Sequence, residues 1–322
     1  MDLKIDTQSD GKTVLEILKR DLGISRATIK HLKFKNNGIT VDGEHVTVRR
    51  ILHDGEILSL AVEDDFTPQK LTPSDLGLRI VYEDDDVIVP DKPSDMPTHQ
   101  SFGHYSDTVA NALAYRYTSQ GTPYVFRPVN RLDRNTSGLL LIARNRLSAA
   151  FLSDQMKKGN VKKQYVAILH GLLTDDHGVI DTYMRRTAQS VIVREVCDEN
   201  GGGDRAITKY QVICRSDTHT MVIATPVTGR THQLRVHFAH VGCPIVGDDL
   251  YGSESDLIGR HALHSFFLSF PSKNGDSVTV TAPLQEDMMR LASNVFEDRL
   301  SEIPADIAEY ILPKSEEKSN EI

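Results

Sequence analysis

One aspartate in this chain stands where its charge could do chemistry. Asp133 lies between Arg131 and Arg134 in a polar stretch, 131–138, that runs directly into the apolar stretch 139–143. Neighbouring arginines favour the ionised form of a carboxyl group, so Asp133 is a poor proton donor and a good permanent anion. Such an anion can serve as a nucleophile or as a structural ion-pair partner. The Thr-Ser-Gly residues that end the polar stretch favour a turn, and we expect this turn to fix the aspartate before a strand begins.

The stretch 131–138 reads Arg-Leu-Asp-Arg-Asn-Thr-Ser-Gly. It resembles the active-site motif of the RluA-type pseudouridine synthases, which carry Arg-Leu-Asp-x-x-Thr-Ser-Gly with a catalytic aspartate. The resemblance implies that Asp133 is the catalytic nucleophile. It also implies that Arg131, beside the nucleophile, binds the substrate and fills the space that the target base leaves.

A second stretch, 163–171, reads Lys-Gln-Tyr-Val-Ala-Ile-Leu-His-Gly and resembles the family's Lys-x-Tyr-x-Ala-x-x-x-Gly motif. Strand alternation alone would place Tyr165 in a core. In the family the tyrosine lies against the target base, so the resemblance makes Tyr165 a catalytic residue that stacks on uracil and helps to remove the carbon-5 proton. Lys163 is a candidate for binding a phosphate or a carboxylate, with a structural role as the alternative.

A third stretch, 228–235, reads Thr-Gly-Arg-Thr-His-Gln-Leu-Arg and resembles the family's Thr-Gly-Arg-Thr-His-Gln-x-Arg motif. The resemblance implies that Arg230 is catalytic and pairs with Asp133, holding it ionised and oriented. Arg235 is a candidate substrate-binding group, again with a structural alternative. Thr231 is positioned to cap a helix that begins near Gln233.

Neither a metal nor a cofactor is expected. His232, His237 and His240 match no standard zinc spacing, and no carboxylate joins them. The chain also lacks the glycine-rich fingerprints of phosphate-binding and dinucleotide-binding loops. A hydrolase that uses Asp133 with a metal stays open as a weaker alternative.

Composition and cysteine content fit a cytoplasmic protein, whereas the overall acidic charge argues weakly against nucleic-acid binding. The chain has 322 residues, a formal charge of −8 and three widely spaced cysteines, and no signal-peptide or membrane-spanning pattern is seen. The stretch 19–50 holds eight cations and three anions, a net charge of +5, whereas the stretch 284–322 holds four cations and ten anions, a net charge of −6. The basic stretch could contact an RNA backbone. A monomer is favoured.

The chain divides into four parts in this interpretation. Residues 1–64 form a small helix–helix–hairpin unit, with the hairpin turn at Asp42-Gly43. This order resembles the RNA-binding domain of small-subunit ribosomal protein four, with a generic α+β cap as the alternative. Residues 65–78 form a linker, residues 79–295 the catalytic domain, and residues 296–322 an acidic C-terminal extension whose last residues, from 314, are disordered.

The fold class is α+β. The catalytic domain is expected to have a mixed, largely antiparallel β-sheet flanked by helices. Helices are predicted at about 107–118 and 146–159, each with apolar residues at helical spacing. The predicted strands share short runs of β-branched and aromatic residues, and they are 80–82, 87–89, 191–193, 210–213, 221–224 and 278–280.

The interpretation is a cofactor-free isomerase that turns uridine into pseudouridine in structured RNA. Ribosomal RNA is the favoured substrate and transfer RNA the alternative. A catalytically silent RNA-binding or ribosome-assembly factor on the same scaffold is the alternative of a different class. Two departures from the family's pattern concern the shape of the RNA groove: Asn130 stands where the family has His, and Asp91 stands where it has Asn.

Overall fold

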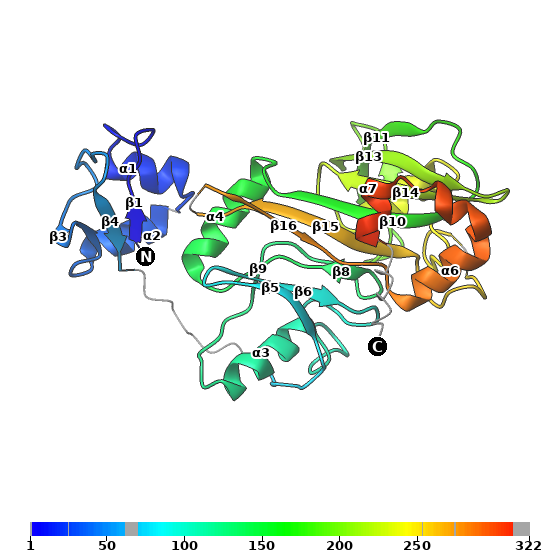
Figure 1. The fold of residues 1–322 in the computed structure, drawn as a ribbon, viewed down its shortest axis with the longest axis horizontal. Coiled ribbons are helices and arrows are strands. Elements are labelled where there is room, and N and C mark those ends of the chain that lie inside the picture. The colour runs from blue at the N-terminus through cyan, green and yellow to red at the C-terminus, as the bar shows by residue number, and fades with distance from the viewer. Residues whose placement is uncertain (1, 25, 62–69, 253, 274, 312–322) are drawn as a thin grey trace, which may run out of the picture.

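The chain folds around two separate sheets. The structure, a computed structural model, describes residues 2–24, 26–61, 70–252, 254–273 and 275–311. Residues 2–61, the N-terminal unit, carry a four-stranded sheet, and residues 70–311, the large unit, carry a twelve-stranded sheet. The two units lie side by side along the longest axis of the molecule (Figure 1).

The N-terminal unit has the predicted helix–helix–hairpin order. Its elements are β1 (Asp2–Lys4), α1 (Val14–Glu16), a π-helix (Ile17–Asp21), α2 (Arg26–Phe34), β2 (Ile39–Val41), β3 (Glu44–His45) and β4 (Ile57–Leu60), with the sheet order β1-β4-β2-β3. Asp42 and Gly43 turn the β2–β3 hairpin with positive φ angles of 48° and 85°. Positive φ at both central residues is what a tight hairpin turn requires, and it explains why Asp-Gly marks the turn.

The N-terminal unit packs on helix α4 (Arg146–Lys157) of the large unit. Its core is apolar, and Leu147 of α4 belongs to it. Lys158 Nζ donates to the carbonyl oxygen of Arg20 at 3.0 Å. A Cβ on Gly23 would lie 2.5 Å from Cβ of Asp154, so this close approach requires glycine.

The large unit confirms the α+β fold. Its strands are β5 (Arg79–Glu83), β6 (Val87–Lys92), β7 (Arg127–Pro128), β8 (Ser137–Leu139), β9 (Ile142–Ala143), β10 (Lys162–His170), β11 (His177–Arg186), β12 (Arg194–Cys197), β13 (Asp204–Arg215), β14 (His219–Pro226), β15 (Leu263–Pro271) and β16 (Ser277–Thr281). Their order is β12-β11-β13-β14-β10-β15-β8-β6-β9-β7, with β16 beside β15 and β5 beside β6. Among the described strands only β8 and β15 pair in parallel, so the sheet is largely antiparallel as predicted.

The predicted strand at 191–193 is wrong. The Ser190 hydroxyl oxygen accepts the N–H groups of Ile192 and Val193, both at 3.1 Å, which turns the chain before β12 begins at Arg194. A serine side chain that bonds the following backbone competes with strand pairing, and here it overrides the β-branched run.

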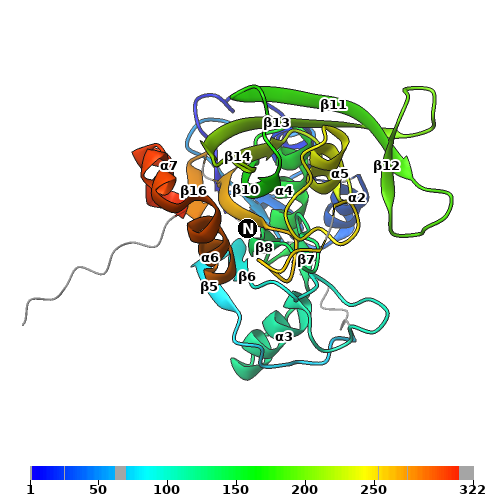
Figure 2. The same ribbon diagram turned by 90° about the vertical axis from the view of Figure 1, so that its right-hand side faces the viewer.

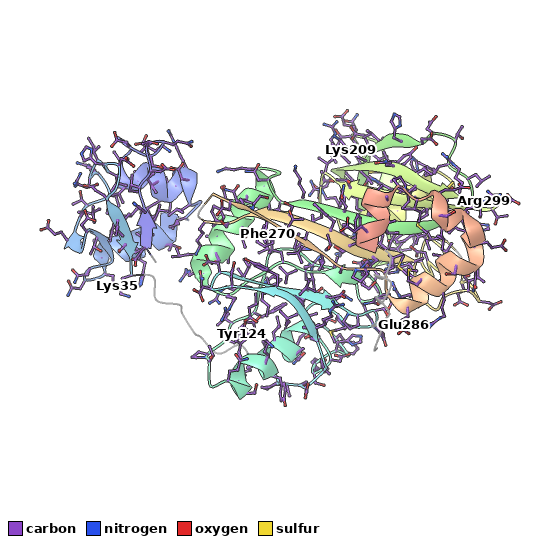
Figure 3. All side chains as sticks on the ribbon, viewed as in Figure 1. Lys35, Tyr124, Lys209, Phe270, Glu286 and Arg299 are labelled. Carbon is purple, nitrogen blue, oxygen red and sulfur yellow. The ribbon has the colours of Figure 1, made fainter. Side chains whose placement is uncertain are left out.

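Helices cover the sheet of the large unit. Helical structure also extends beyond residue 295, where the sequence predicts that the catalytic domain ends. These helices are α3 (Val109–Ser119), α4, α5 (Gln233–His240), α6 (Glu286–Phe296), a 3₁₀ helix (Glu297–Glu302) and α7 (Ala305–Ile311). Figure 2 shows α6 and α7 on one side of the large unit and β12 extending on the other. Tyr124, labelled in Figure 3, follows α3, and its ring stacks on that of Tyr117 with the ring centroids 4.5 Å apart.

The segment after residue 295 is part of the large unit's core. Phe296 and Ile303 are buried in the same apolar cluster as the central strands. The acidic tail from residue 314 lies outside the described residues. The predicted linker is described only from residue 70, and no helix or strand forms between residues 70 and 78.

Candidate active site

The loop 131–138 is the centre of the site and connects β7 to β8. The Asp133 carbonyl accepts the N–H of Thr136 at 3.1 Å, which is the turn that the sequence predicts. Gly138 ends the loop with a φ of 106°, and a Cβ there would lie 2.2 Å from the carbonyl oxygen of Ser265. Only glycine allows β8 to approach β15 this closely.

Lys92 ties this loop to the segment that follows β6. Its side chain is fully buried, and Nζ donates to the carbonyl oxygens of Pro93, Met96 and Arg134, each at 2.8 Å. Burial and the nearby Arg260 guanidinium lower the pKa of Lys92 to about 7. The three carbonyls satisfy all three donors of an ammonium group and so favour its charged form. The sequence gives Lys92 no role beyond its place in a Lys-Pro pair.

Arg260 holds the loop from the opposite side. Its Nε and Nη2 atoms form a bidentate pair with Asp287 at 2.6 and 2.9 Å. Nη1 donates to the carbonyl oxygens of Asn135 and Leu263 at 3.1 and 3.2 Å, and Nη2 donates to the Ser137 hydroxyl at 3.2 Å. One buried guanidinium therefore joins the loop, the start of β15 and helix α6.

Two buried histidines complete the support. His261 Nε2 lies 2.8 Å from the Thr136 hydroxyl, and His264 Nδ1 lies 2.8 Å from the Ser137 hydroxyl. Burial lowers the pKa of His261 to about 3 and that of His264 to about 4. Both rings are therefore neutral near neutral pH and act as hydrogen-bonding partners of the loop.

The Asp133 carboxylate, 31% exposed, faces one arginine and one histidine. Arg235 Nη1 and His232 Nε2 each lie 3.9 Å from Asp133 Oδ2. Arg235 is itself buried and oriented by Asp248, whose carboxylate oxygens accept from Nε and Nη2 at 2.8 and 2.6 Å. Since Asp248 occupies two donors of the guanidinium fork, the third nitrogen is directed at Asp133.

The predicted pairing of Arg230 with Asp133 is wrong. Arg230 Nε donates to the carbonyl oxygen of Arg205 at 3.1 Å, and its Nη1 lies 3.5 Å from Asp204. Arg230 and Asp133 are both among the described residues, and no ion pair joins them within 4.0 Å. Arg230 precedes helix α5, whereas Arg235 lies on the buried side of that helix.

Thr231 does not cap helix α5. The residue before the helix is His232, whose left-handed φ of 59° is uncommon for a side chain of this size. Gln233 holds the preceding turn, because its Oε1 accepts from the Thr228 hydroxyl at 2.7 Å and from the Arg230 N–H at 3.0 Å. This geometry turns His232 toward the site.

His232 is also fixed from outside the loop. Its Nδ1 lies 2.8 Å from the Tyr251 hydroxyl, which accepts the N–H of Arg194 at 2.9 Å. Burial lowers the pKa of His232, and the charge of Asp133 opposes that shift. In the sequence His232 is a residue of the third motif with no assigned role, and its place beside Asp133 depends on the left-handed turn.

Tyr165 reaches the same site from β10. It is buried between its strand partners Ala224 of β14 and Ser265 of β15. Burial and the charge of Asp133 raise the pKa of Tyr165 to about 12, so the side chain is a neutral phenol near neutral pH.

The two remaining candidates are close to Asp133 and Tyr165 in the sequence. Arg131 is exposed, and its charge adds to burial in lowering the pKa of His99. Lys163 is partly buried on β10, two residues before Tyr165, and burial lowers its pKa. The site thus joins Asp133 to Arg235 and Tyr165, with Arg131 at its exposed edge.

Among the described residues, no group of three or more His, Cys, Asp or Glu side chains could hold a metal ion. None of the described helices is long and apolar enough to span a bilayer.

Comparison with known proteins shows the family of this chain. Residues 86–240, from β6 through α5, match the family model described as RNA pseudouridylate synthase. A Bacillus subtilis protein named uncharacterized RNA pseudouridine synthase YjbO is 36% identical over 272 residues, which cover 84% of this chain and 95% of the relative. The chain belongs to the RNA pseudouridine synthase family. Enzymes of this family are isomerases that act on uridine in RNA.

Further relatives support the same membership. The ribosomal large subunit pseudouridine synthase D of Pseudomonas aeruginosa is 33% identical over 280 residues, covering 82% of the synthase and 86% of the relative. The solved structure of human RNA pseudouridylate synthase domain containing 1 matches with a TM-score of 0.53 and 31% identity, over 64% of the synthase and 83% of the human chain. The family that the three sequence motifs indicate is thereby confirmed.

Proposed function

We propose that the synthase converts uridine to pseudouridine in ribosomal RNA, with Asp133 as the nucleophile. The observation that carries this proposal is the partly exposed Asp133 carboxylate, 3.9 Å from both Arg235 and His232. Ribosomal RNA is favoured because several relatives, such as that of Pseudomonas aeruginosa, are named as large-subunit ribosomal enzymes. Transfer RNA is the alternative substrate.

The proposed reaction needs an anion held at the bond between ribose and base. Asp133 attacks either the sugar or the base, the bond from the sugar to nitrogen-1 breaks, the uracil turns, and a bond from the sugar to carbon-5 forms. The bond to Asp133 then breaks, carbon-5 loses its proton and nitrogen-1 gains one, so the product is an isomer of the substrate. The carboxylate must stay aimed until the base arrives. Arg235 can orient it, because Asp248 fixes the Arg235 guanidinium before substrate binds.

Tyr165 is proposed to stack on the uracil as a neutral phenol. Its raised pKa makes the phenolate rare near neutral pH, so a role as the base that takes the carbon-5 proton would require prior deprotonation. A buried phenol instead offers an apolar face to the uracil and a hydroxyl that can hydrogen-bond. Arg131 at the exposed edge is proposed to bind the RNA beside the target.

The N-terminal unit is proposed to add affinity for the RNA backbone. Lys30 and Lys33 are exposed on α2, which contains no acidic residue. Exposed lysines that neutralise phosphates release counterions, so the affinity should fall steeply with salt. Resemblance of this unit to the RNA-binding domain of small-subunit ribosomal protein four supports the same role.

The test is a pseudouridine map of ribosomal and transfer RNA from cells with and without the synthase. A ribosomal uridine should lose its modification and regain it with the wild-type chain but not with Asp133→Ala. On RNA carrying that site, Asp133→Ala should lower kcat by roughly 10⁴-fold or more, as removal of a nucleophile does in other enzymes. Asp217→Ala, which removes an exposed carboxylate paired with Arg299, is the matched control and should retain full activity.

Each other outcome changes a specific part of the proposal. Retained turnover by Asp133→Ala would refute the nucleophile. A lost site in transfer RNA alone would change the substrate. A wild-type chain that binds ribosomal RNA and forms no pseudouridine would favour the silent RNA-binding alternative.

A further inference from the structure

Phe102 is the most exposed large apolar side chain among the described residues, at 96%. It stands at the tip of a tight turn in which Ser101 and His104 exchange backbone hydrogen bonds at 3.2 and 3.0 Å. Gly103 completes the turn with a φ of 81°. At this exposure, the ring makes little contact with the other residues that the structure describes.

The turn is held from several directions. His104 Nδ1 lies 2.5 Å from an Asp107 carboxylate oxygen. The carbonyl oxygen of Tyr105 accepts from Gln100 Nε2 at 2.5 Å and from Asn111 Nδ2 of α3 at 3.0 Å. These bonds fix the backbone on both sides of Phe102, so the ring is presented from an ordered support.

The same turn is joined to the catalytic loop. The Thr98 hydroxyl donates to the carbonyl oxygen of Leu132 at 2.8 Å and accepts the N–H of Leu132 at 3.2 Å. Leu132 directly precedes Asp133. Phe102 is four positions after Thr98, and a chain of that length spans at most about 14 Å. Phe102 therefore stands within one or two nucleotide lengths of the catalytic loop.

A cation belongs to the segment that hydrogen-bonds to Thr98, because Arg131 directly precedes Leu132. Arg131 is exposed, and its charge acts on His99, three residues before Phe102. Proteins bind unpaired nucleic acid by combining cations that bind the phosphates with aromatic rings that stack on the bases. The ring and the guanidinium here belong to two segments that hydrogen-bond to each other.

We propose that Phe102 stacks on the base of an unpaired nucleotide next to the target uridine. This inference rests on the proposed function, because it assumes an RNA substrate at Asp133. Extracting the target base from its stack leaves the neighbouring base without a partner on one face. The ring of Phe102 replaces that partner, so it positions the RNA and takes no part in bond breaking.

The chain has no tryptophan, and this allows a direct test of stacking. Phe102→Trp places a single indole at the tip, and stacking on a base should quench its emission. The measurement is made in the Asp133→Ala background, so that no turnover occurs, with ribosomal RNA from cells lacking the synthase as the probe. A continuous 20-base-pair RNA duplex, whose bases are all stacked, is the second probe.

Leu172→Trp in the same background is the control. Leu172 is 50% exposed and lies seven residues beyond Tyr165, past the far end of β10, which is about 20 Å along an extended chain. Ribosomal RNA should quench the indole at position 102 and leave that at position 172 unchanged, and the duplex should quench neither. Equal quenching at both positions, quenching by the duplex, or no quenching at position 102 would each overturn the proposal.

Measuring turnover tests the role of Phe102 independently of the fluorescence experiment. Phe102→Ala should lower kcat/KM by roughly ten-fold, the effect of losing one base–aromatic stack, while Phe102→Trp and Leu172→Ala stay near the wild-type value. Wild-type turnover by Phe102→Ala would refute the positioning role. If the wild-type chain forms no pseudouridine, the proposed function fails, and the quenching experiment still decides whether Phe102 stacks on RNA.

Discussion

The two units of the synthase are stabilised by different kinds of contact. In the N-terminal unit, Thr28 and Thr40 are the only buried polar residues among those described. The large unit buries charged and titratable side chains, namely Lys92, Arg235, Asp248, Arg260, His237, His261 and His264. The contrast indicates that apolar packing is sufficient to fold the N-terminal unit, whereas the loop that carries Asp133 requires buried polar contacts to keep its conformation.

The large unit needs these buried polar contacts because of the backbone groups of the loop 131–138. A loop carries backbone donors and acceptors that no neighbouring strand satisfies, and burying them unpaired is costly. Lys92 and Arg260 supply donors to the carbonyls of this loop, and they are themselves satisfied only when the loop is in place. Loop and support therefore stabilise each other, and Asp133 is held in one geometry before substrate arrives.

Arg260→Met is expected to cause the largest loss of stability, and the loss should be confined to the large unit. The substitution leaves Asp287 without its bidentate partner and removes the donors to Asn135 and Ser137. Breaking one side of a buried pair costs about 3 kcal/mol of unfolding free energy. Urea unfolding should show that loss, and hydrogen exchange should speed up in residues 131–140 while residues 1–60 are unchanged.

Arg290→Met is the matched control for that experiment. Arg290 is exposed on α6, and its pair with Glu286 is 3.7 Å long. Pairs of this kind contribute little, so the stability should stay within about 0.5 kcal/mol of the wild type. If both variants behave alike, or if exchange speeds up equally in both units, the loop does not depend on Arg260 as described.

A second prediction uses low pH to destabilise the large unit through one of its buried histidines. His264 has a folded-state pKa of about 4, below the value of 6.5 for an unfolded histidine. The unfolded chain binds the extra proton first, so this histidine's contribution to stability is complete above pH 6.5 and is lost as the pH falls from 6.5 to 4. The loss at pH 4 should be about 2–3 kcal/mol for this one group.

Comparison with His264→Asn isolates that contribution. The variant should be less stable than the wild type at pH 7, and the difference should shrink toward pH 4 in urea unfolding. His45→Asn, which changes an exposed histidine of the N-terminal unit, should show the same pH dependence as the wild type. A constant difference between pH 7 and pH 4 would mean that His264 is not neutral in the folded protein.

The smallest expected effect belongs to the N-terminal unit. The Thr13 hydroxyl accepts the Glu16 N–H at 3.3 Å, and the Glu16 carboxylate accepts the Thr13 N–H at 3.0 Å. Thr13→Ala removes half of this capping box at a cost of about 1 kcal/mol. Hydrogen exchange should speed up in residues 13–22 and stay unchanged in residues 131–140, and Thr7→Ala should have no effect on either. Faster exchange in the loop would show that the two units unfold together.

Local chemistry made much of the fold predictable from the sequence. Asp42-Gly43 specifies its hairpin turn because both residues tolerate positive φ, and the spacing of apolar residues indicates α3 and α4. The turn that holds Asp133 follows from its own Thr-Ser-Gly residues. Each of these signals lies within a few residues of the structure that it predicts.

The partner of Asp133 was not predictable in the same way. Arg230 and Arg235 are five residues apart, and which one faces the carboxylate depends on where α5 begins and which side it buries. That start is set by the left-handed His232 and by Gln233, whose side chain holds the preceding turn. Tertiary packing, and not the motif itself, selects Arg235.

The contacts of Lys92 have a consequence for how this protein can change. All three of its acceptors are main-chain carbonyls, from positions 93, 96 and 134. Every amino acid supplies such a carbonyl, so substitutions at these positions leave the acceptors in place as long as the backbone conformation is unchanged. This one anchor of the loop therefore requires a particular side chain only at position 92, and as far as these contacts are concerned the side chains at positions 93, 96 and 134 are free to vary.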